Sequence, residues 1–441
     1  MRATAVAKQL YQELYQELNS ARGITVNARF SAAAVGADRP FVTPVELWQQ
    51  NPRLQLAMRV RGISEAEITG AAADYEKLIA LLGVLAHTAG STLAADLAAD
   101  LAWLTAPAAP DHAAEIWQAT CARLFERNVT PRTLLARDRA ALVAVSACDV
   151  GAASALGGTL LPLLSLDRLA DITAPDFAIS AQTVGKNCNI AVTDLASLEA
   201  ALEQTVAAFA AAGAVAALID LSGFSGFKSP DPYHAGLLLA AAMAGQGDTL
   251  TAEDRALWQA QLLRTVGQRL ATHGMRLVVQ ISPKTEHVMG DFSALAFRRL
   301  LSYLADKGAL VKTLLTLAAG ELPAGLSVLL DRFHDKQEKP LLYFGIAGAG
   351  AASPELSRSL RYYLRRGAGP LLLGITDDER GFFSAPTKAR FCRVLADELA
   401  RFAENDAHCA ANGSDLTNLE QLVAQAKDIA AENAARFFGL V

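Results

Sequence analysis

Seven short apolar runs, together with a β-prone run at residues 24–30, alternate with longer helical patterns and constrain the fold of this 441-residue chain more than any other feature. The runs span residues 24–30, 141–147, 159–165, 215–221, 276–282, 313–319, 341–347 and 370–376. Strands separated by helices pair in parallel, because a parallel partner can be reached only through a long crossover. Eight such strands predict an α/β fold with a (β/α)8 barrel, the TIM barrel. The run at 159–165 contains Pro162, so a loop is an alternative there.

The chain between the first two runs has a different pattern. Within residues 44–137, apolar side chains recur three and four positions apart, as in PVELWQQNPRLQLAMRV and AAADYEKLIALLGVLAH. This spacing is typical of amphipathic helices. We therefore predict an all-helical insertion at 44–137, and a barrel with C-terminal helices formed by residues 1–43 and 138–441.

A further helical pattern follows the eighth run. In the segment NLEQLVAQAKDIAAENAARFFGLV, five side chains fall on nearly one face of a helix: Leu422, Ala426, Ile429, Asn433 and Phe437. This pattern predicts a C-terminal helical extension of the barrel.

The composition narrows the classes of partner and the compartment. A net charge of -5 with both signs interspersed gives no electrostatic reason to expect nucleic acid or an anionic membrane. Charged residues interrupt every apolar stretch before the length of about 18 residues that a spanning helix needs. The five cysteines form no CxxC pair, which argues against a disulfide framework. We expect a cytoplasmic protein with a small-molecule or protein partner.

The end of the eighth run is the first candidate for a functional site. The stretch GPLLLGITDDERGFF (369–383) joins a buried apolar strand to Asp377, Asp378, Glu379 and Arg380. In parallel α/β folds, ligands and catalytic groups collect at the carboxyl ends of the strands. The alternative is an ordinary loop whose acidic residues cap the next helix.

Six stretches of the chain resemble, in order and at similar spacing, the uronate isomerase (glucuronate isomerase) family of the amidohydrolase superfamily. They span residues 56–78, 112–124, 312–317, 343–348, 375–384 and 427–438. The resemblance implies a TIM barrel of the metal-dependent-hydrolase type, with a helical insertion after the first strand. It also implies an aldose-ketose isomerase that interconverts a hexuronate and its keto isomer by moving a proton between adjacent carbons.

The resemblance further implies a divalent metal, commonly zinc, held by a His-x-His pair on strand one, a His on strand five and an Asp on strand eight. This chain departs from that pattern, since Asn27, Arg29 and Gln280 stand at the three histidine positions. A guanidinium has no acceptor and stays charged, so Arg29 would repel a cation. Asp378 and Arg380 match the strand-eight motif. We therefore expect neither zinc nor another cofactor.

Two hypotheses describe the strand-eight motif. In the first, Asp378 is a base or polar anchor, Arg380 and Arg29 bind the carboxylate of a sugar acid, and Asn27 and Gln280 also contact that substrate. In the second, Asp378 pairs with Arg29 across the barrel mouth, and the site is inert.

Three functional hypotheses follow. The leading one is a family homologue with a degraded metal site that binds a sugar acid and is weakly active or inactive. The alternative is an active isomerase converting D-glucuronate to D-fructuronate in hexuronate catabolism. The third is a non-catalytic structural or partner subunit. A homo-oligomer is expected in each case.

Overall fold

A computed structural model of the chain shows how these patterns are arranged. It describes residues 2–20, 23–28, 32–49, 51–88, 91–105, 112–137, 140–147, 149–157, 160–221, 224, 226–281, 293–317, 329, 333–335, 337, 339–348, 353–365, 368–377, 385–409 and 419–440.

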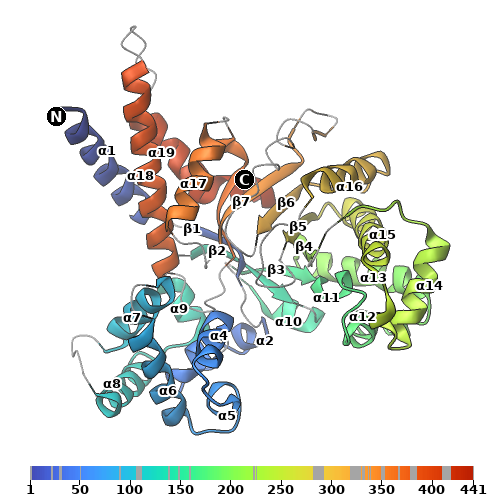
Figure 1. Ribbon diagram of the computed structural model, residues 1–441, viewed down its shortest axis with the longest axis horizontal. Helices are drawn as coiled ribbons and strands as arrows, with labels where there is room; N and C mark the ends of the chain where they lie inside the picture. Colours follow the sequence, from blue (N-terminus) through green and yellow to red (C-terminus); the bar gives the residue numbers. More distant parts are fainter. Residues whose placement is uncertain are drawn as a thin grey trace.

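Eight strands form a closed, all-parallel barrel in chain order (Figure 1). They are β1 (Gly23–Ala28), β2 (Ala140–Ala147), β3 (Leu160–Ser165), β4 (Ala216–Asp220), β5 (Arg276–Ile281), β6 (Thr313–Leu317), β7 (Leu342–Gly348) and β8 (Leu372–Asp377). Thr25 of β1 pairs with Ile375 of β8 and closes the ring. Each strand begins within two residues of a predicted run, and Pro162 lies inside β3. The α/β class predicted from the alternation is therefore confirmed.

The two faces of the strands pack into separate apolar clusters. Leu218, Val278 and Leu314 face the barrel interior, where they pack with Leu163, Tyr343 and Leu373. Their neighbours Ile219, Val279 and Leu315 belong to the cluster beneath the surrounding helices. Because successive strand residues point to opposite faces, burial on both sides explains why apolar residues follow one another directly in these runs.

Helices surround the barrel and fill the long connections. Before β2 they are α1 (Arg2–Ser20), α2 (Ala32–Ala37), α3 (Val45–Trp48), α4 (Pro52–Val60), α5 (Glu65–Ile68), α6 (Asp74–His87), α7 (Thr92–Thr105), α8 (Ala113–Glu126) and α9 (Pro131–Arg137). Between β2 and β7 they are α10 (Val150–Ala155), α11 (Asp167–Ala170), α12 (Phe177–Lys186), α13 (Leu195–Ala211), α14 (Pro232–Met243), η1 (Gly247–Thr249), α15 (Ala252–Thr272) and α16 (Ala294–Asp306). After β7 come α17 (Ser353–Leu364), η4 (Gly369–Leu371), α18 (Ala385–Cys409), α19 (Leu419–Lys427), η5 (Asp428–Glu432) and α20 (Asn433–Phe438).

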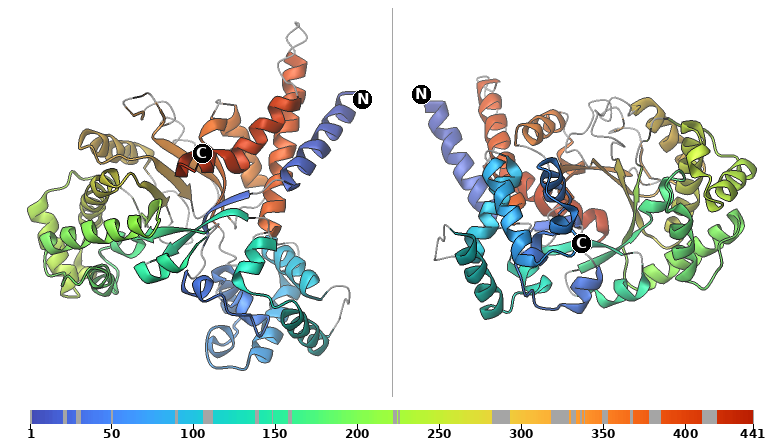
Figure 2. Two further views of the ribbon diagram at one scale, coloured as in Figure 1. Left: turned by 180° about the vertical axis from the view of Figure 1, so that it is seen from behind. Right: turned by 60° about the horizontal axis from the view of Figure 1, so that its bottom comes forward.

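Helices α3 to α9, which lie between β1 and β2 in the chain, gather into a lobe beside the barrel, opposite α12 to α16 (Figures 1 and 2). This helical lobe, α3 to α9, has its own apolar cluster, which includes Trp48, Leu78 and Leu124. The apolar faces of these amphipathic helices therefore pack against one another within the lobe.

The C-terminal helices close one end of the barrel. Phe437 and Phe438 of α20 pack with Tyr343, Leu373 and the other inward-facing strand residues. Asn433, which is 1% exposed, donates hydrogen bonds to the carbonyls of Gly369 at 2.9 Å and Leu372 at 2.7 Å. The predicted helical face is confirmed, since Leu422, Ala426, Ile429, Asn433 and Phe437 are all buried.

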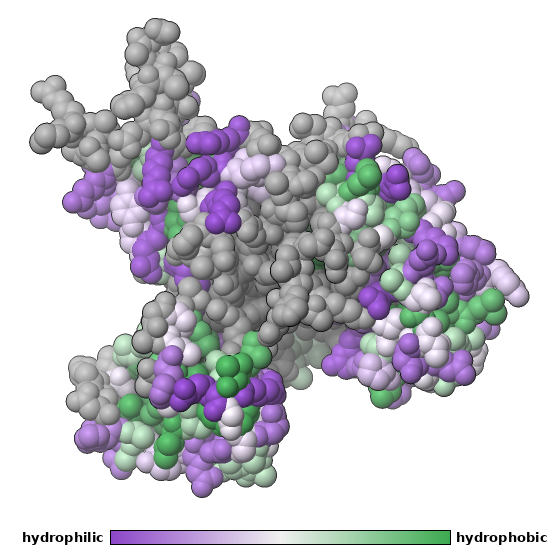
Figure 3. Space-filling model, in the orientation of Figure 1, coloured by the Kyte–Doolittle hydropathy of each residue, from purple (hydrophilic) through white to green (hydrophobic). Residues whose placement is uncertain are grey.

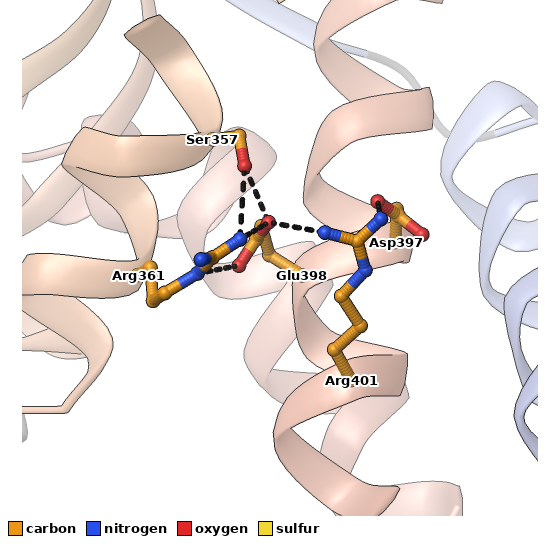
Figure 4. Close-up of polar contacts among 5 residues, drawn as sticks. All are labelled: Ser357, Arg361, Asp397, Glu398 and Arg401. Carbon is orange, nitrogen blue, oxygen red and sulfur yellow. Dashed lines mark hydrogen bonds and ion pairs between the residues drawn. The ribbon is translucent and has the colours of Figure 1, made fainter. Parts of the chain in front are cut away.

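A polar cluster joins α17 to α18 on the outside of the barrel (Figure 4). Glu398 accepts two hydrogen bonds from the guanidinium of Arg361, at 2.9 and 2.8 Å, and one from the hydroxyl of Ser357. Arg401 lies 3.5 Å from the same carboxylate. The Glu398 side chain is only 2% exposed, so these donors replace the water that its charge would otherwise bind.

The outer surface is mixed in character. Hydrophilic and hydrophobic side chains are intermingled over the helical lobe and over α14 to α16 (Figure 3). Among the described residues, no helix combines the length and the apolar character needed to cross a membrane. Cys121, Cys188 and Cys392 are free thiols, and burial raises the pKa of Cys392 to about 11.

Candidate functional site

A polar row crosses three neighbouring strands inside the barrel. Asp220 on β4 is in register with Gln280 on β5, and Gln280 is in register with Thr316 on β6. Each lies two residues after an inward-facing apolar residue of its strand, so all three point into the barrel. Each also lies near the carboxyl end of its strand, where the sites of parallel barrels are built.

An apolar layer lies directly below this row. Leu218, Val278 and Leu314 form it on the same three strands. Tyr343 of β7 lies against Phe437 with ring centroids 5.1 Å apart, at the closed end of the barrel. Burial raises the pKa of Tyr343, so its phenol stays neutral near pH 7. The barrel is thus apolar at one end and becomes polar at the level of Asp220.

The three side chains of the row offer complementary hydrogen-bonding groups. Gln280 is 2% exposed and Thr316 is 1% exposed, whereas Asp220 is half-buried. A carboxylate accepts hydrogen bonds and can take a proton, while an amide and a hydroxyl each both donate and accept. This set suits a ligand rich in hydroxyl groups, and the carboxylate adds a candidate base.

Ser165 extends the polar surface to β3. Its hydroxyl donates a hydrogen bond of 3.0 Å to the carboxylate of Asp167, the first residue of α11. Ser165 is two residues beyond the inward-facing Leu163, so it too is on the inner face. Asp167 therefore serves at least to orient Ser165 at the edge of the polar row.

The predicted site residues are placed unequally. Gln280 lies in the polar row. Asn27 belongs to the backbone of β1, but its side chain is outside the described part of the structure. Arg29, Asp378 and Arg380 also lie outside the described residues. The predicted ion pair between Asp378 and Arg29 therefore remains a prediction.

Sequence reasoning missed Asp220 and Thr316. Asp220 is the one charged residue of the run VAALIDL, and Thr316 lies in the middle of the run TLLTLAA. The available signal was alternation, because both lie two positions after a large inward-facing aliphatic residue. That signal becomes useful only once the inward face of each strand is known.

The polar row of Asp220, Gln280 and Thr316 does not offer the ligands that zinc prefers. Zinc sites use thiolates, imidazoles and carboxylates, whereas the polar row supplies one carboxylate, one amide and one hydroxyl. The described residues include no group of three or more His, Cys, Asp or Glu side chains that could hold a metal ion. Two of the described imidazoles lie outside the barrel: His234 of α14 is 3.5 Å from Asp254, and His273, directly after α15, is 3.8 Å from Glu203.

Comparison with known sequences places the chain in a family. The sequence model described as glucuronate isomerase matches residues 1–438. A uronate isomerase of Streptococcus equi subsp. zooepidemicus (strain MGCS10565) is 23% identical over 469 residues, which cover 97% of each chain. A uronate isomerase of Vibrio vulnificus (strain YJ016) is 23% identical over 446 residues, covering 93% of this chain and 92% of that protein.

Comparison with solved structures agrees at the level of the fold. Uronate isomerase from Thermotoga maritima superimposes with a TM-score of 0.80 at 17% identity, covering 98% of this chain and 97% of that one. Glucuronate isomerase from Caulobacter crescentus gives a TM-score of 0.77 at 15% identity, covering 99% and 95%. With the family match spanning residues 1–438, the chain belongs to the glucuronate isomerase family.

Proposed function

We propose that this protein is an aldose-ketose isomerase of hexuronates, converting D-glucuronate to D-fructuronate in carbohydrate catabolism. The observation that carries the proposal is the family match along residues 1–438. The curated relatives that match over more than nine-tenths of their length are named uronate isomerase. This favours the active alternative over the degraded homologue that the missing histidines suggested.

At the level of the fold, we propose a barrel of the metal-dependent-hydrolase type with two parts. Residues 1–43 and 138–441 form the barrel with its C-terminal helices, and residues 44–137 form a helical insertion. The separate apolar cluster of the helical lobe supports this division.

The proposed reaction moves one proton between two carbons of the substrate. A carboxylate base removes the proton from C2 of the aldose, a second proton transfer relocates the hydroxyl proton from O2 to O1, and C1 is then protonated to give the ketose. We assign the base to Asp378. Arg380 and Arg29 bind the uronate carboxylate through paired hydrogen bonds, and Asn27 and Gln280 bind substrate hydroxyls.

No step of this proposal passes through a metal ion. Isomerisation by proton transfer needs a base whose pKa is near the operating pH, and hydrogen-bond donors that stabilise the enediolate oxygens. The side-chain amides of Asn27 and Gln280 are such donors, and they stand at two of the three histidine positions of the family pattern.

The competing hypotheses are a protein that binds a sugar acid without turnover and a partner subunit that binds none. Purified protein should be incubated with D-glucuronate, and both the initial rate of ketose formation and the ketose present at equilibrium should be measured. Turnover on the order of 10 per second, the median for enzymes, would support the proposal. A rise in melting temperature with glucuronate but no ketose would establish the binding protein instead. Neither effect with any hexuronate would leave the partner subunit.

Two variants test whether Asp378 acts as the base or whether losing any carboxylate lowers activity. Asp378→Asn should lower kcat by a factor on the order of 100 or more, because it removes the group that takes the proton. Asp176→Asn is the control, since Asp176 pairs with Arg168 at the surface and its side chain is 44% exposed. Equal activity of the Asp378→Asn variant and the wild type would refute the assignment of the base.

A further inference from the structure

Strand β6 contains two buried threonines whose hydroxyls have different surroundings. Thr313 is fully buried, and its Oγ1 donates a hydrogen bond of 2.8 Å to the carbonyl of Val311. Thr316 is 1% exposed, and its Oγ1 has no hydrogen-bond partner among the described residues. Burying a hydroxyl without a partner is unfavourable, so the second threonine calls for a different explanation from the first.

Local structure does not require a hydroxyl at this position. Valine has nearly the shape of threonine and is as favourable in a strand, and it would avoid the unmet hydrogen bond. Buried polar groups without partners are rare in native proteins and often mark functional positions. Thr316 also faces the barrel interior and is in register with Gln280, so its hydroxyl belongs to the polar row.

The row has a geometry suited to a polyhydroxylated chain. Neighbouring strands lie about 4.8 Å apart, so Asp220, Gln280 and Thr316 present three groups over a length comparable with that of an extended six-carbon sugar acid. Thr316 occupies the far end of the row from the carboxylate. A ligand hydroxyl at that end could both donate to and accept from the threonine.

We propose that Thr316 is a specificity-determining residue whose buried hydroxyl hydrogen-bonds one hydroxyl of the bound hexuronate, next to Gln280. This assignment rests on the proposed function and refines it, because it names a residue of the same site that reads the substrate's hydroxyl pattern. Thr316 takes no part in proton transfer.

The experiment compares three variants of the full chain. Thr316→Val removes the hydroxyl and keeps the shape, Thr316→Ser keeps the hydroxyl, and Thr313→Val removes a hydroxyl that is already bonded within the protein. Binding is measured by calorimetry with D-glucuronate and with its C4 epimer, D-galacturonate. Steady-state kinetics give KM and kcat, and melting temperatures report folding.

We expect Thr316→Val to weaken binding of the preferred hexuronate by about threefold to tenfold, the usual effect of one neutral hydrogen bond. Its KM should rise while kcat stays near the wild-type value, and the affinity ratio between the two epimers should change. Thr316→Ser should retain most of the affinity. Thr313→Val should lower the melting temperature and leave both affinities unchanged.

Two other outcomes would overturn the proposal in distinguishable ways. Suppose that the wild type binds a hexuronate and that Thr316→Val binds each epimer with the same affinity as the wild type. Thr316 then does not contact the substrate, and the proposed function survives. If the wild type neither binds nor converts any hexuronate, the proposed function fails, and this assignment fails with it.

Discussion

Arg390 of α18 donates a hydrogen bond to the carboxylate of Asp96 in α7, joining two residues that are 294 positions apart in the sequence. The Arg390 side chain is 12% exposed and that of Asp96 is 4% exposed. One partner belongs to the helical lobe and the other to a helix packed on the barrel. The lobe is therefore attached to the barrel through a buried ion pair as well as through the chain.

Breaking this pair should destabilise the protein markedly. Arg390→Ala leaves the buried carboxylate of Asp96 without its guanidinium partner, and we expect the free energy of unfolding to fall by about 3 kcal/mol. Urea denaturation would measure the change. Arg393→Ala is the control, because Arg393 is exposed and bonds only the carbonyl of Ala389 in its own helix among the contacts described. Equal losses for the two variants would contradict the role of the pair.

The Glu398 cluster should make stability depend on pH. Burial alone would raise the pKa of Glu398, but the hydrogen bonds from Arg361 and Ser357 outweigh it and hold the pKa below its usual value. A carboxyl with a lower pKa in the folded state stabilises the fold above its unfolded pKa of about 4.3. That contribution is lost as the pH falls through the folded pKa.

The comparison of wild type with Glu398→Gln tests this sign. We expect the wild type to be more stable by about 1–3 kcal/mol at pH 7. The difference should stay constant down to about pH 5 and shrink as the solution is made more acidic. Denaturation curves between pH 7 and pH 3 would show it. A difference that grows in acid would mean that the cluster does not favour the charged carboxyl.

The closure of the barrel by α20 predicts a large cavity effect. Phe437 is fully buried against Tyr343 and Phe438, so Phe437→Ala should cost about 3–5 kcal/mol. Phe125→Ala makes the same chemical change at a side chain that is 88% exposed, and it should alter stability by less than about 0.5 kcal/mol. Thermal denaturation of the two variants would compare them, and similar shifts in melting temperature would exclude a packing role for α20.

Two helical glycines should respond oppositely to alanine. A Cβ at Gly267 of α15 would lie 2.0 Å from the carbonyl oxygen of Ala309, so Gly267→Ala should destabilise the fold by about 1–3 kcal/mol. A Cβ at Gly83 of α6 meets nothing within 4 Å, so Gly83→Ala should stabilise it by about 0.5–1 kcal/mol. Chemical denaturation would measure both, and the same sign for both would show that close approach is not decisive.

Much of the fold could be predicted from local hydrophobic patterns, because strands that are buried on both faces appear in the sequence as short apolar runs. Each apolar run has to be a strand or a short helix. The long helical patterns between the runs supply the crossovers that parallel strands need, so they indicate parallel pairing. Amphipathic spacing also identified the buried face that contains Ile429 and Asn433. Spacing could not show what this face packs against, because it records burial and not the neighbouring element.

Long-range pairs were beyond sequence reasoning for a different reason. Nothing near Asp96 or Glu398 in the sequence indicates that either carboxylate is buried, since acidic residues on helices are normally exposed. Their partners come from other elements, Arg390 from α18 and Arg361 from α17. Such pairs become visible only when the helices are packed.

The candidate site was predictable in part. The family resemblance pointed to Gln280, and the structure places this residue in the polar row. Asp220 and Thr316 gave no comparable signal, because an isolated Asp or Thr within an apolar run does not by itself show which face of the strand it lies on. Their significance comes from register, which brings three separate runs to the same height in the barrel.

The position of α20 at the closed end of the barrel also affects how this protein can be synthesised. The barrel needs β8 beside β1, and its interior needs Phe437 and Phe438, so a nascent chain leaving the ribosome cannot complete its core until residue 438 has cleared the exit tunnel. Throughout elongation the early strands would expose apolar surface to the cell. Chaperones that shield growing polypeptides would then act on this protein at least until residue 438 has been synthesised.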